Sequence, residues 1–144
     1  MAKKSKALLY EVPAREAENP DDDHFVNRDG LRFAGHHLII DLWGGHNLDN
    51  LPLVETTLIE AVSEIGATLL NIDLHRFSPN GGISGIAVLA ESHMSIHTWP
   101  EKGYAALDVF VCGDCLPYKA IPVLRRAFLP ANIQVAEMKR GLIL

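Results

Sequence analysis

Hydrophobic and polar residues alternate along several stretches of the chain, which is the pattern of a β-strand with one face in a core. In the first such stretch Leu38, Ile40 and Leu42 share one face, and polar or aromatic side chains occupy the other. The alternation, together with the turn residues between stretches, predicts six strands, at residues 36–43, 67–77, 84–90, 93–99, 104–112 and 132–138.

Two other segments have apolar residues at helical spacing. Such residues recur between positions 51 and 65, and Gly66 follows where a C-terminal cap is expected. A second helix is predicted for residues 119–129, where Pro122 must lie in the first turn or kink the helix.

The order of these elements predicts the fold class. Short loops between successive strands favour an antiparallel sheet whose apolar face is covered by the two helices, an α+β two-layer sandwich. The opposite face is expected to carry polar and aromatic side chains that are costly to bury unpaired, and it is therefore predicted to be a site, a surface for a partner, or both. Its members are His37, Asp41, Asp73, His75, Phe77, Asp108 and Cys112.

Composition is typical of a single globular domain. Of the 144 residues, 48% are hydrophobic and 22% are charged, which suffices for one packed core. The net charge of −5 and the lack of a basic stripe argue against nucleic acid as a partner. The sequence has neither an apolar run of roughly 18 residues, which a membrane crossing needs, nor a secretory signal. We therefore expect a cytoplasmic protein without membrane attachment.

The beginning of the chain differs from the rest. Residues 1–32 contain the acidic run Glu16–Asp23, two prolines and little apolar periodicity. This composition predicts a flexible acidic extension, followed by one domain over residues 33–144.

The cysteines leave two interpretations open. Cys112 and Cys115 form a C-x-x-C pair between a predicted strand and a predicted helix. In that context a thiol can carry out disulfide exchange, so a thiol oxidoreductase is one candidate function. A packing role as small buried residues is the other. His93 and His97 are four residues apart, but two histidines do not complete a zinc site, and we expect no metal.

The longest specific pattern lies in residues 75–113, HRFSPNGGISGIAVLAESHMSIHTWPEKGYAALDVFVCG. This segment closely resembles the core of the prokaryotic S-adenosylmethionine decarboxylases, small pyruvoyl-dependent enzymes of polyamine (spermidine) synthesis. The similarity covers residues 35–139 in the order of the predicted elements. It implies that the chain converts S-adenosylmethionine to decarboxylated S-adenosylmethionine and carbon dioxide.

The resemblance also implies that the chain is a zymogen that cuts itself. In such processing Ser92 attacks the carbonyl of Glu91, the peptide becomes an ester, and β-elimination with loss of ammonia leaves a pyruvoyl group on the downstream fragment. The products are residues 1–91 and 92–144, and no external cofactor is needed. By resemblance His97 accepts the proton in this step and Ser84 positions the intermediate. We expect a strained, tight connection before Ser92.

Catalysis implied by the resemblance uses the pyruvoyl group as an electron sink. The substrate's amino group condenses with its ketone to form a Schiff base, and charge from decarboxylation moves into the conjugated carbonyl. Cys112 is then the proton donor. Phe77, Trp99 and Glu101 match positions near the nucleoside, where the aromatic rings can stack on adenine or face the sulfonium and the carboxylate can bind ribose.

A homodimer is implied too, with the polar sheet faces together and sites built from both protomers. Other hypotheses remain open at this point. Relatives of the family apply the same machinery to arginine or another amino acid such as ornithine, and an unprocessed, silent paralogue would keep its serine at position 92.

Overall fold

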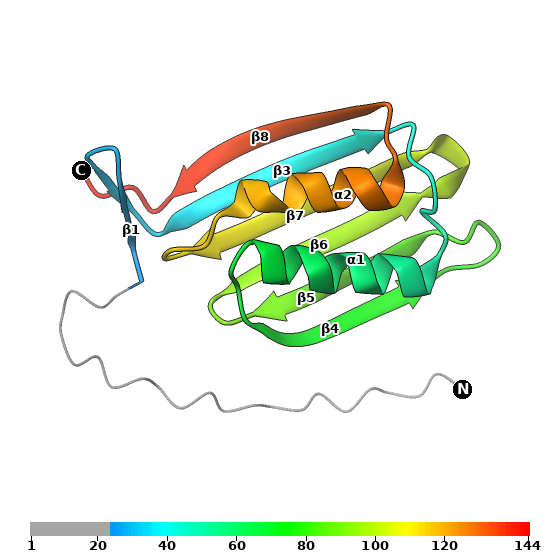
Figure 1. Ribbon diagram of the computed structural model, residues 1–144, viewed down its shortest axis with the longest axis horizontal. Helices are drawn as coiled ribbons and strands as arrows, with labels where there is room; N and C mark the ends of the chain where they lie inside the picture. Colours follow the sequence, from blue (N-terminus) through cyan, green and yellow to red (C-terminus); the bar gives the residue numbers. More distant parts are fainter. Residues whose placement is uncertain (1–23) are drawn as a thin grey trace.

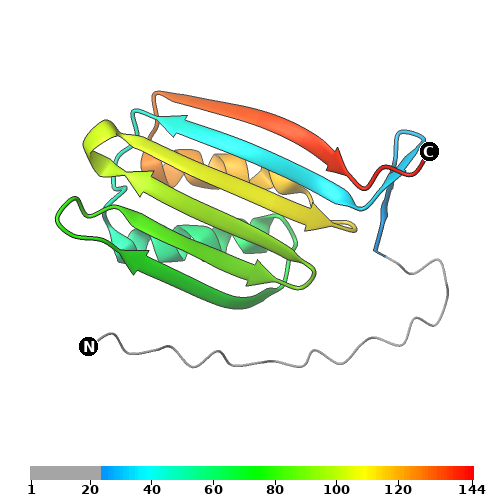
Figure 2. The same ribbon diagram turned by 180° about the vertical axis from the view of Figure 1, so that it is seen from behind.

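The computed structural model describes residues 24–144, and its main feature is a six-stranded antiparallel sheet in the order β4-β5-β6-β7-β3-β8. The strands are β3 (Gly35–Trp43), β4 (Leu69–Arg76), β5 (Ile83–Leu89), β6 (Ser92–Trp99), β7 (Tyr104–Cys112) and β8 (Asn132–Arg140). Helices α1 (Leu51–Glu64) and α2 (Ala120–Phe128) lie side by side on one face (Figure 1). The other face carries no described element (Figure 2), so the α+β two-layer sandwich is confirmed.

Local chemistry explains where the helices begin and end. The Asn50 side chain accepts a hydrogen bond from the Leu53 amide at 3.1 Å and caps α1. Gly66 follows the end of α1 with a φ of +81°, a conformation that glycine adopts without strain. Pro122 is the third residue of α2 and therefore removes no hydrogen bond within the helix. Two short 3₁₀ turns, η1 (Pro100–Lys102) and η2 (Pro117–Lys119), complete the connections.

The core lies between the helices and the sheet. Leu38, Ile40 and Leu42 of β3, which the alternation predicted to face inward, are fully buried. The alternation fails in β4, where the apolar side chain of Leu70 is 40% exposed. The register shifts between Leu69 and Asn71, and such a bulge reverses the direction of the side chains that follow it.

The N-terminal hairpin is a second difference from expectation. Residues 24–32 were predicted to be flexible, but β1 (Val26–Arg28) pairs with β2 (Leu31–Phe33). Phe33 is fully buried and Val26 is 4% exposed, so the hairpin is held by packing. The acidic run Glu16–Asp23 lies outside the described residues.

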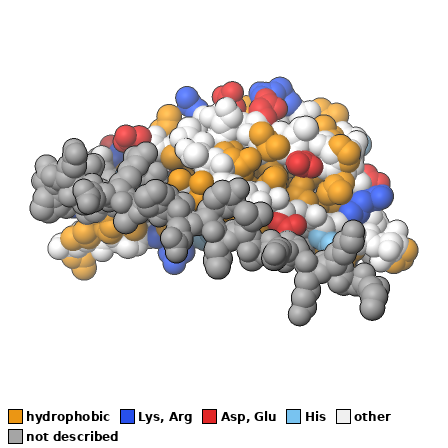
Figure 3. All heavy atoms as spheres, turned by 90° about the horizontal axis from the view of Figure 1, so that it is seen from below, with side chains coloured by type: hydrophobic (Ala, Val, Ile, Leu, Met, Phe, Trp, Pro, Cys, Tyr) orange, Lys and Arg blue, Asp and Glu red, His pale blue; other side chains and the backbone are white. Residues whose placement is uncertain are grey.

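The two edges of the sheet carry different kinds of side chain. Figure 3 views the molecule from the side of β4 and shows hydrophobic side chains exposed among charged ones. At the opposite edge β8 carries Glu137, Lys139 and Arg140, and charged edge residues discourage pairing with another sheet. Within residues 24–144, no helix has both the length and the apolarity needed to span a membrane.

Candidate active site

The connection between β5 and β6 is as tight as predicted. Leu89 pairs with Ser92, so only Ala90 and Glu91 link the two strands. Glu91 has a φ of +61°, a left-handed conformation that costs a non-glycine residue about 1–2 kcal/mol. The residue with the strained backbone is therefore the one directly before Ser92.

The Cys112 thiol meets this connection from the neighbouring strand. Its Sγ donates a hydrogen bond to the Glu91 carbonyl oxygen at 3.2 Å and lies 3.5 Å from Ser92 Oγ. Ser92 begins β6 and Cys112 ends the adjacent antiparallel β7, which explains how residues 20 positions apart meet. The Cys112 thiol is therefore within hydrogen-bonding reach of both the Ser92 hydroxyl and the Glu91 carbonyl oxygen.

His24 completes the surroundings of Glu91. The Gly113 amide donates to the His24 carbonyl at 2.8 Å, and His24 Nε2 is 3.9 Å from Glu91 Oε1. Sequence reasoning missed this residue because the acidic composition around it predicted a flexible extension.

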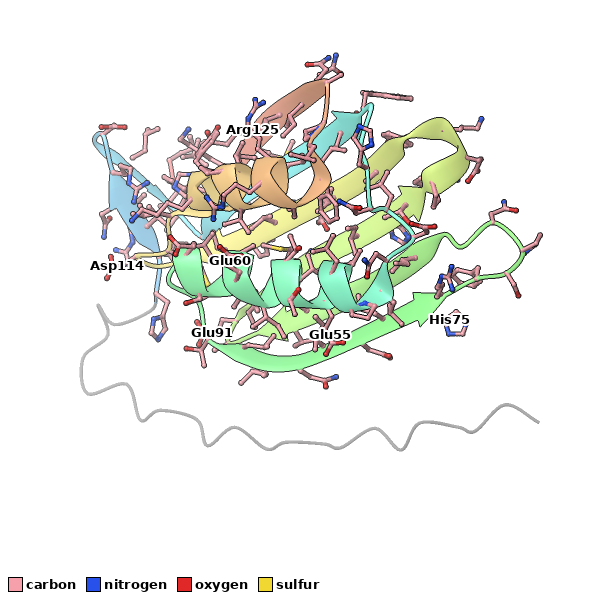
Figure 4. All side chains as sticks on the ribbon, turned by 45° about the vertical axis from the view of Figure 1, so that its right-hand side comes forward. Glu55, Glu60, His75, Glu91, Asp114 and Arg125 are labelled. Carbon is pink, nitrogen blue, oxygen red and sulfur yellow. The ribbon has the colours of Figure 1, made fainter. Side chains whose placement is uncertain are left out.

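Ser84 and His97 form a separate pair. They are directly opposite each other in β5 and β6, and Ser84 Oγ lies 2.9 Å from His97 Nδ1. His97 is five residues from Ser92 in one strand, so their Cα atoms are about 16 Å apart at the usual rise per residue. Figure 4 shows the same separation, with Glu91 at one end of the sheet and His75, which pairs with Ser84, toward the other.

A cavity of about 200 Å³ lies beside this second pair. The three predicted nucleoside-binding residues, Phe77, Trp99 and Glu101, line it together with Ser84 and His97. Phe77 is 51% exposed and Trp99 is 39% exposed, so neither ring is buried in the core. The predicted site residues thus fall into two groups, one around Ser92 and Cys112 and one around this cavity.

Between the two groups lies a hydrogen-bond network centred on Asp108. Its Oδ2 accepts from His37 Nε2 at 2.6 Å and His93 Nε2 at 2.9 Å, and Ser95 donates to Oδ1. Burial raises the pKa of Asp108, but the hydrogen bonds from Ser95, His37 and His93 outweigh burial and hold that pKa below its usual range. The strand pattern predicted Asp108 on the polar face, but the cross-strand register that joins these residues was not predicted.

The same network has the spacing of a metal site. In the part of the chain that the structure describes, His37, His93 and Asp108 are the one group of three whose ligand atoms lie within 4.8 Å of one another. Arg140 Nη1 is 3.1 Å from His37 Nδ1, and because a guanidinium only donates, we assign the ring proton of neutral His37 to Nε2. In this arrangement Nε2 donates to Asp108.

The second cysteine does not join the site. Cys115 Sγ lies 3.6 Å from the Gly66 carbonyl oxygen, whereas Cys112 faces Glu91. Burial raises the pKa of the Cys115 thiol, and the nearby charge of Asp114 raises it further. Disulfide exchange needs an accessible thiolate, so this environment opposes the thiol oxidoreductase hypothesis.

The fold and the paired reactive groups are those of a small two-layer α+β enzyme. Residues 36–141 match the model of the S-adenosylmethionine decarboxylase family. A Thermomicrobium roseum protein named S-adenosylmethionine decarboxylase proenzyme is 48% identical over 114 residues, which cover 78% of this chain and 98% of that one. A protein of the same name from Methanococcus maripaludis strain C7 is 50% identical over 116 residues, which cover 78% and 94%.

A solved structure agrees with the sequence relatives. The crystal structure of the adenosylmethionine decarboxylase from Aquifex aeolicus has a TM-score of 0.70 and 31% identity, and the match covers 78% of this chain and 94% of that one. The chain therefore belongs to the S-adenosylmethionine decarboxylase family, as the motif in residues 75–113 predicted. The hairpin of β1 and β2 precedes the matched residues.

Proposed function

We propose that this chain is a self-processing decarboxylase of S-adenosylmethionine whose pyruvoyl group derives from Ser92. The observation that carries the proposal is the contact of the Cys112 thiol with both the Ser92 hydroxyl and the carbonyl of Glu91, whose backbone is strained. The name proenzyme, carried by the relatives, fits a chain that must be cut before it acts. In the family this product feeds polyamine synthesis.

Processing is a sequence of steps at one peptide bond. Ser92 Oγ attacks the Glu91 carbonyl carbon, the C–N bond breaks, and the acyl group moves from nitrogen to oxygen to form an ester. A base then removes the Cα proton of Ser92, the C–O bond breaks, and the Glu91 carboxylate leaves. The remaining enamine takes up water and releases ammonia. The cut yields fragments 1–91 and 92–144.

Residues of this chain are suited to those steps. The strain of the left-handed backbone at Glu91 is relieved when the peptide bond after it breaks, and this relief lowers the free-energy cost of the rearrangement. The Cys112 thiol donates to the carbonyl that is attacked and so stabilises negative charge on its oxygen. His97, whose Nδ1 faces the Ser84 hydroxyl at 2.9 Å, is the candidate base.

The residues also fit the chemistry of the mature enzyme. A pyruvoyl group at position 92 would supply the electron sink for carbon dioxide loss. Cys112, whose sulfur is 3.5 Å from Ser92 Oγ, is the candidate that returns a proton to the α-carbon. The aromatic rings and carboxylate of the cavity suit a substrate with a purine, a ribose and a sulfonium.

Substrate preference tests this proposal. Carbon dioxide release should be detected with S-adenosylmethionine and fall to background with arginine or ornithine, because neither amino acid has a ring to stack on Phe77 or Trp99. The measurement uses each substrate labelled at the carboxyl carbon. Release from arginine or ornithine alone would contradict the assignment of the substrate.

A single protomer does not bring the two groups of site residues together, and we propose that a homodimer does. The open sheet face exposes apolar side chains at 38% or more, including Ile39, Ile86, Val88 and Met138. Such a patch is typical of a surface that a partner covers. In such a dimer the two open sheet faces would stack on each other, with a two-fold axis between them that runs perpendicular to the strands. The strands of the two protomers would then run in opposite directions, so Ser92 of one protomer would face the His97 end of its partner.

Complementation of two inactive variants tests this arrangement. Ser92→Ala and His97→Ala should each block cleavage when expressed alone. When they are co-expressed, the His97→Ala chain should be cleaved, because its Ser92 meets an intact His97 from the partner. Intact mass distinguishes the two chains. An uncut His97→Ala chain in the mixed sample would show that each site is built within one protomer.

A further inference from the structure

Three aromatic rings lie in a row across β3, β7 and β6 at the cavity end of the sheet. The Trp43 and Tyr104 ring centroids are 4.3 Å apart, those of Tyr104 and Trp99 are 5.2 Å apart, and both pairs are inclined by 22°. Tyr104 is thus the middle ring of a nearly parallel stack. Trp99 is the member that also lines the cavity.

The middle ring is held by a hydrogen bond. The Tyr104 hydroxyl donates to Asp41 Oδ1 at 2.6 Å, across from β7 to β3. This bond to Asp41, more than burial, raises the pKa of Tyr104. The phenol therefore has contacts on both faces and at its tip, and its ring plane is set by Trp43, Trp99 and Asp41.

This arrangement determines what Trp99 can offer to a ligand. Tyr104 covers one face of the indole, so a planar ligand must use the other face. The indole is 39% exposed. The imidazole of His97 lies beside it, with ring centroids 6.5 Å apart and ring planes inclined by 44°. Without support from Tyr104, the exposed indole could rotate, and a ligand would lose binding energy in ordering it.

We propose that Asp41 and Tyr104 are positioning residues that hold Trp99 in the orientation that binds the purine of the substrate. The inference rests on the proposed function and adds two residues to which that function assigned no role. Asp41 acts through Tyr104, and Tyr104 acts through the face of Trp99 that it covers. Neither residue exchanges a proton with the substrate.

Kinetics of Tyr104→Phe and Asp41→Asn test the proposal. Both variants keep the shape of the side chain and remove or weaken one hydrogen bond. KM for S-adenosylmethionine should rise about 2- to 10-fold, the penalty for ordering one more side chain on binding. The value of kcat should stay within about twofold, because the reacting atoms are unaffected. Inhibition by adenosine, a probe with the purine but no reacting group, should weaken by the same factor.

The chain offers a matched control. The Tyr118 hydroxyl donates to Glu137 Oε2 at 2.7 Å, a bond of the same kind on another part of the molecule. Tyr118→Phe should leave KM, kcat and inhibition by adenosine unchanged. Intact mass should show each variant cut as completely as the parent chain, so that processing does not account for the difference.

The outcomes separate this inference from the function on which it rests. If the parent chain does not decarboxylate S-adenosylmethionine, the proposed function fails. If the parent chain is active but Tyr104→Phe and Asp41→Asn keep its KM and its inhibition by adenosine, the positioning role is wrong. A fall in kcat with unchanged KM would also contradict it, since that result would place Tyr104 in the chemical step.

Discussion

Alanine at position 92 is expected to abolish both cleavage of the chain and decarboxylation. The variant lacks the hydroxyl that attacks the Glu91 carbonyl and the atoms from which the pyruvoyl group is made. Its fold should be unchanged, because Ser92 is half-buried at the first position of β6 and its one side-chain hydrogen bond is the 3.5 Å contact to Cys112. Denatured intact mass measures cleavage, and release of labelled carbon dioxide measures activity.

A serine on α1 provides the control. Ser63 is exposed and lies on a helix that takes no part in the proposed site. Ser63→Ala should be cut and active like the parent chain. Cleavage of Ser92→Ala at the same bond would mean that another group attacks the Glu91 carbonyl.

Replacement of Cys112 with serine is expected to lower the rate of decarboxylation by about 10²- to 10⁴-fold, the usual contribution of a general acid. A hydroxyl is a far weaker acid than a thiol and returns the proton slowly. Because Cys112 also donates to the Glu91 carbonyl, the substitution can change the rate of cleavage as well. The rate should therefore be measured per cut chain, with the mass of the fragment 92–144 as the count.

Cys115 distinguishes this account from thiol exchange. Cys115→Ser should keep most of the decarboxylase activity, because its sulfur faces the Gly66 carbonyl oxygen and contacts neither Glu91 nor Ser92. A C-x-x-C oxidoreductase requires both thiols. Equal losses of decarboxylation in the two variants would contradict a separate role for Cys112.

Much of the fold follows from period-two and helical patterns. Because successive side chains of a strand point to opposite faces, the sequence alone placed Leu38 in the core and Cys112 on the polar face. The bulge at Leu69–Asn71 broke this logic, since a single extra residue leaves no clear mark in the hydrophobic pattern. The hairpin at residues 26–33 was missed because the acidic run Glu16–Asp23 dominates the composition of residues 1–32.

The sequence named candidate residues for the site but not the way in which they are assembled. The motif named Ser84, Ser92, His97 and Cys112, and the roles given to them remain proposals. Their spatial grouping depends on cross-strand register, which sets Ser84 opposite His97 and leaves Ser92 at the other end of β6. The Asp108 network and the bond from Tyr104 to Asp41 have the same origin, since both join residues from strands distant in the sequence.

The denatured intact mass of freshly purified protein shows whether the chain converts Ser92 to a pyruvoyl group. We expect two fragments divided between Glu91 and Ser92, the second lighter by one ammonia than simple hydrolysis would leave it. A single species at the full-length mass, or a second fragment with an ordinary serine at its start, would contradict the claim.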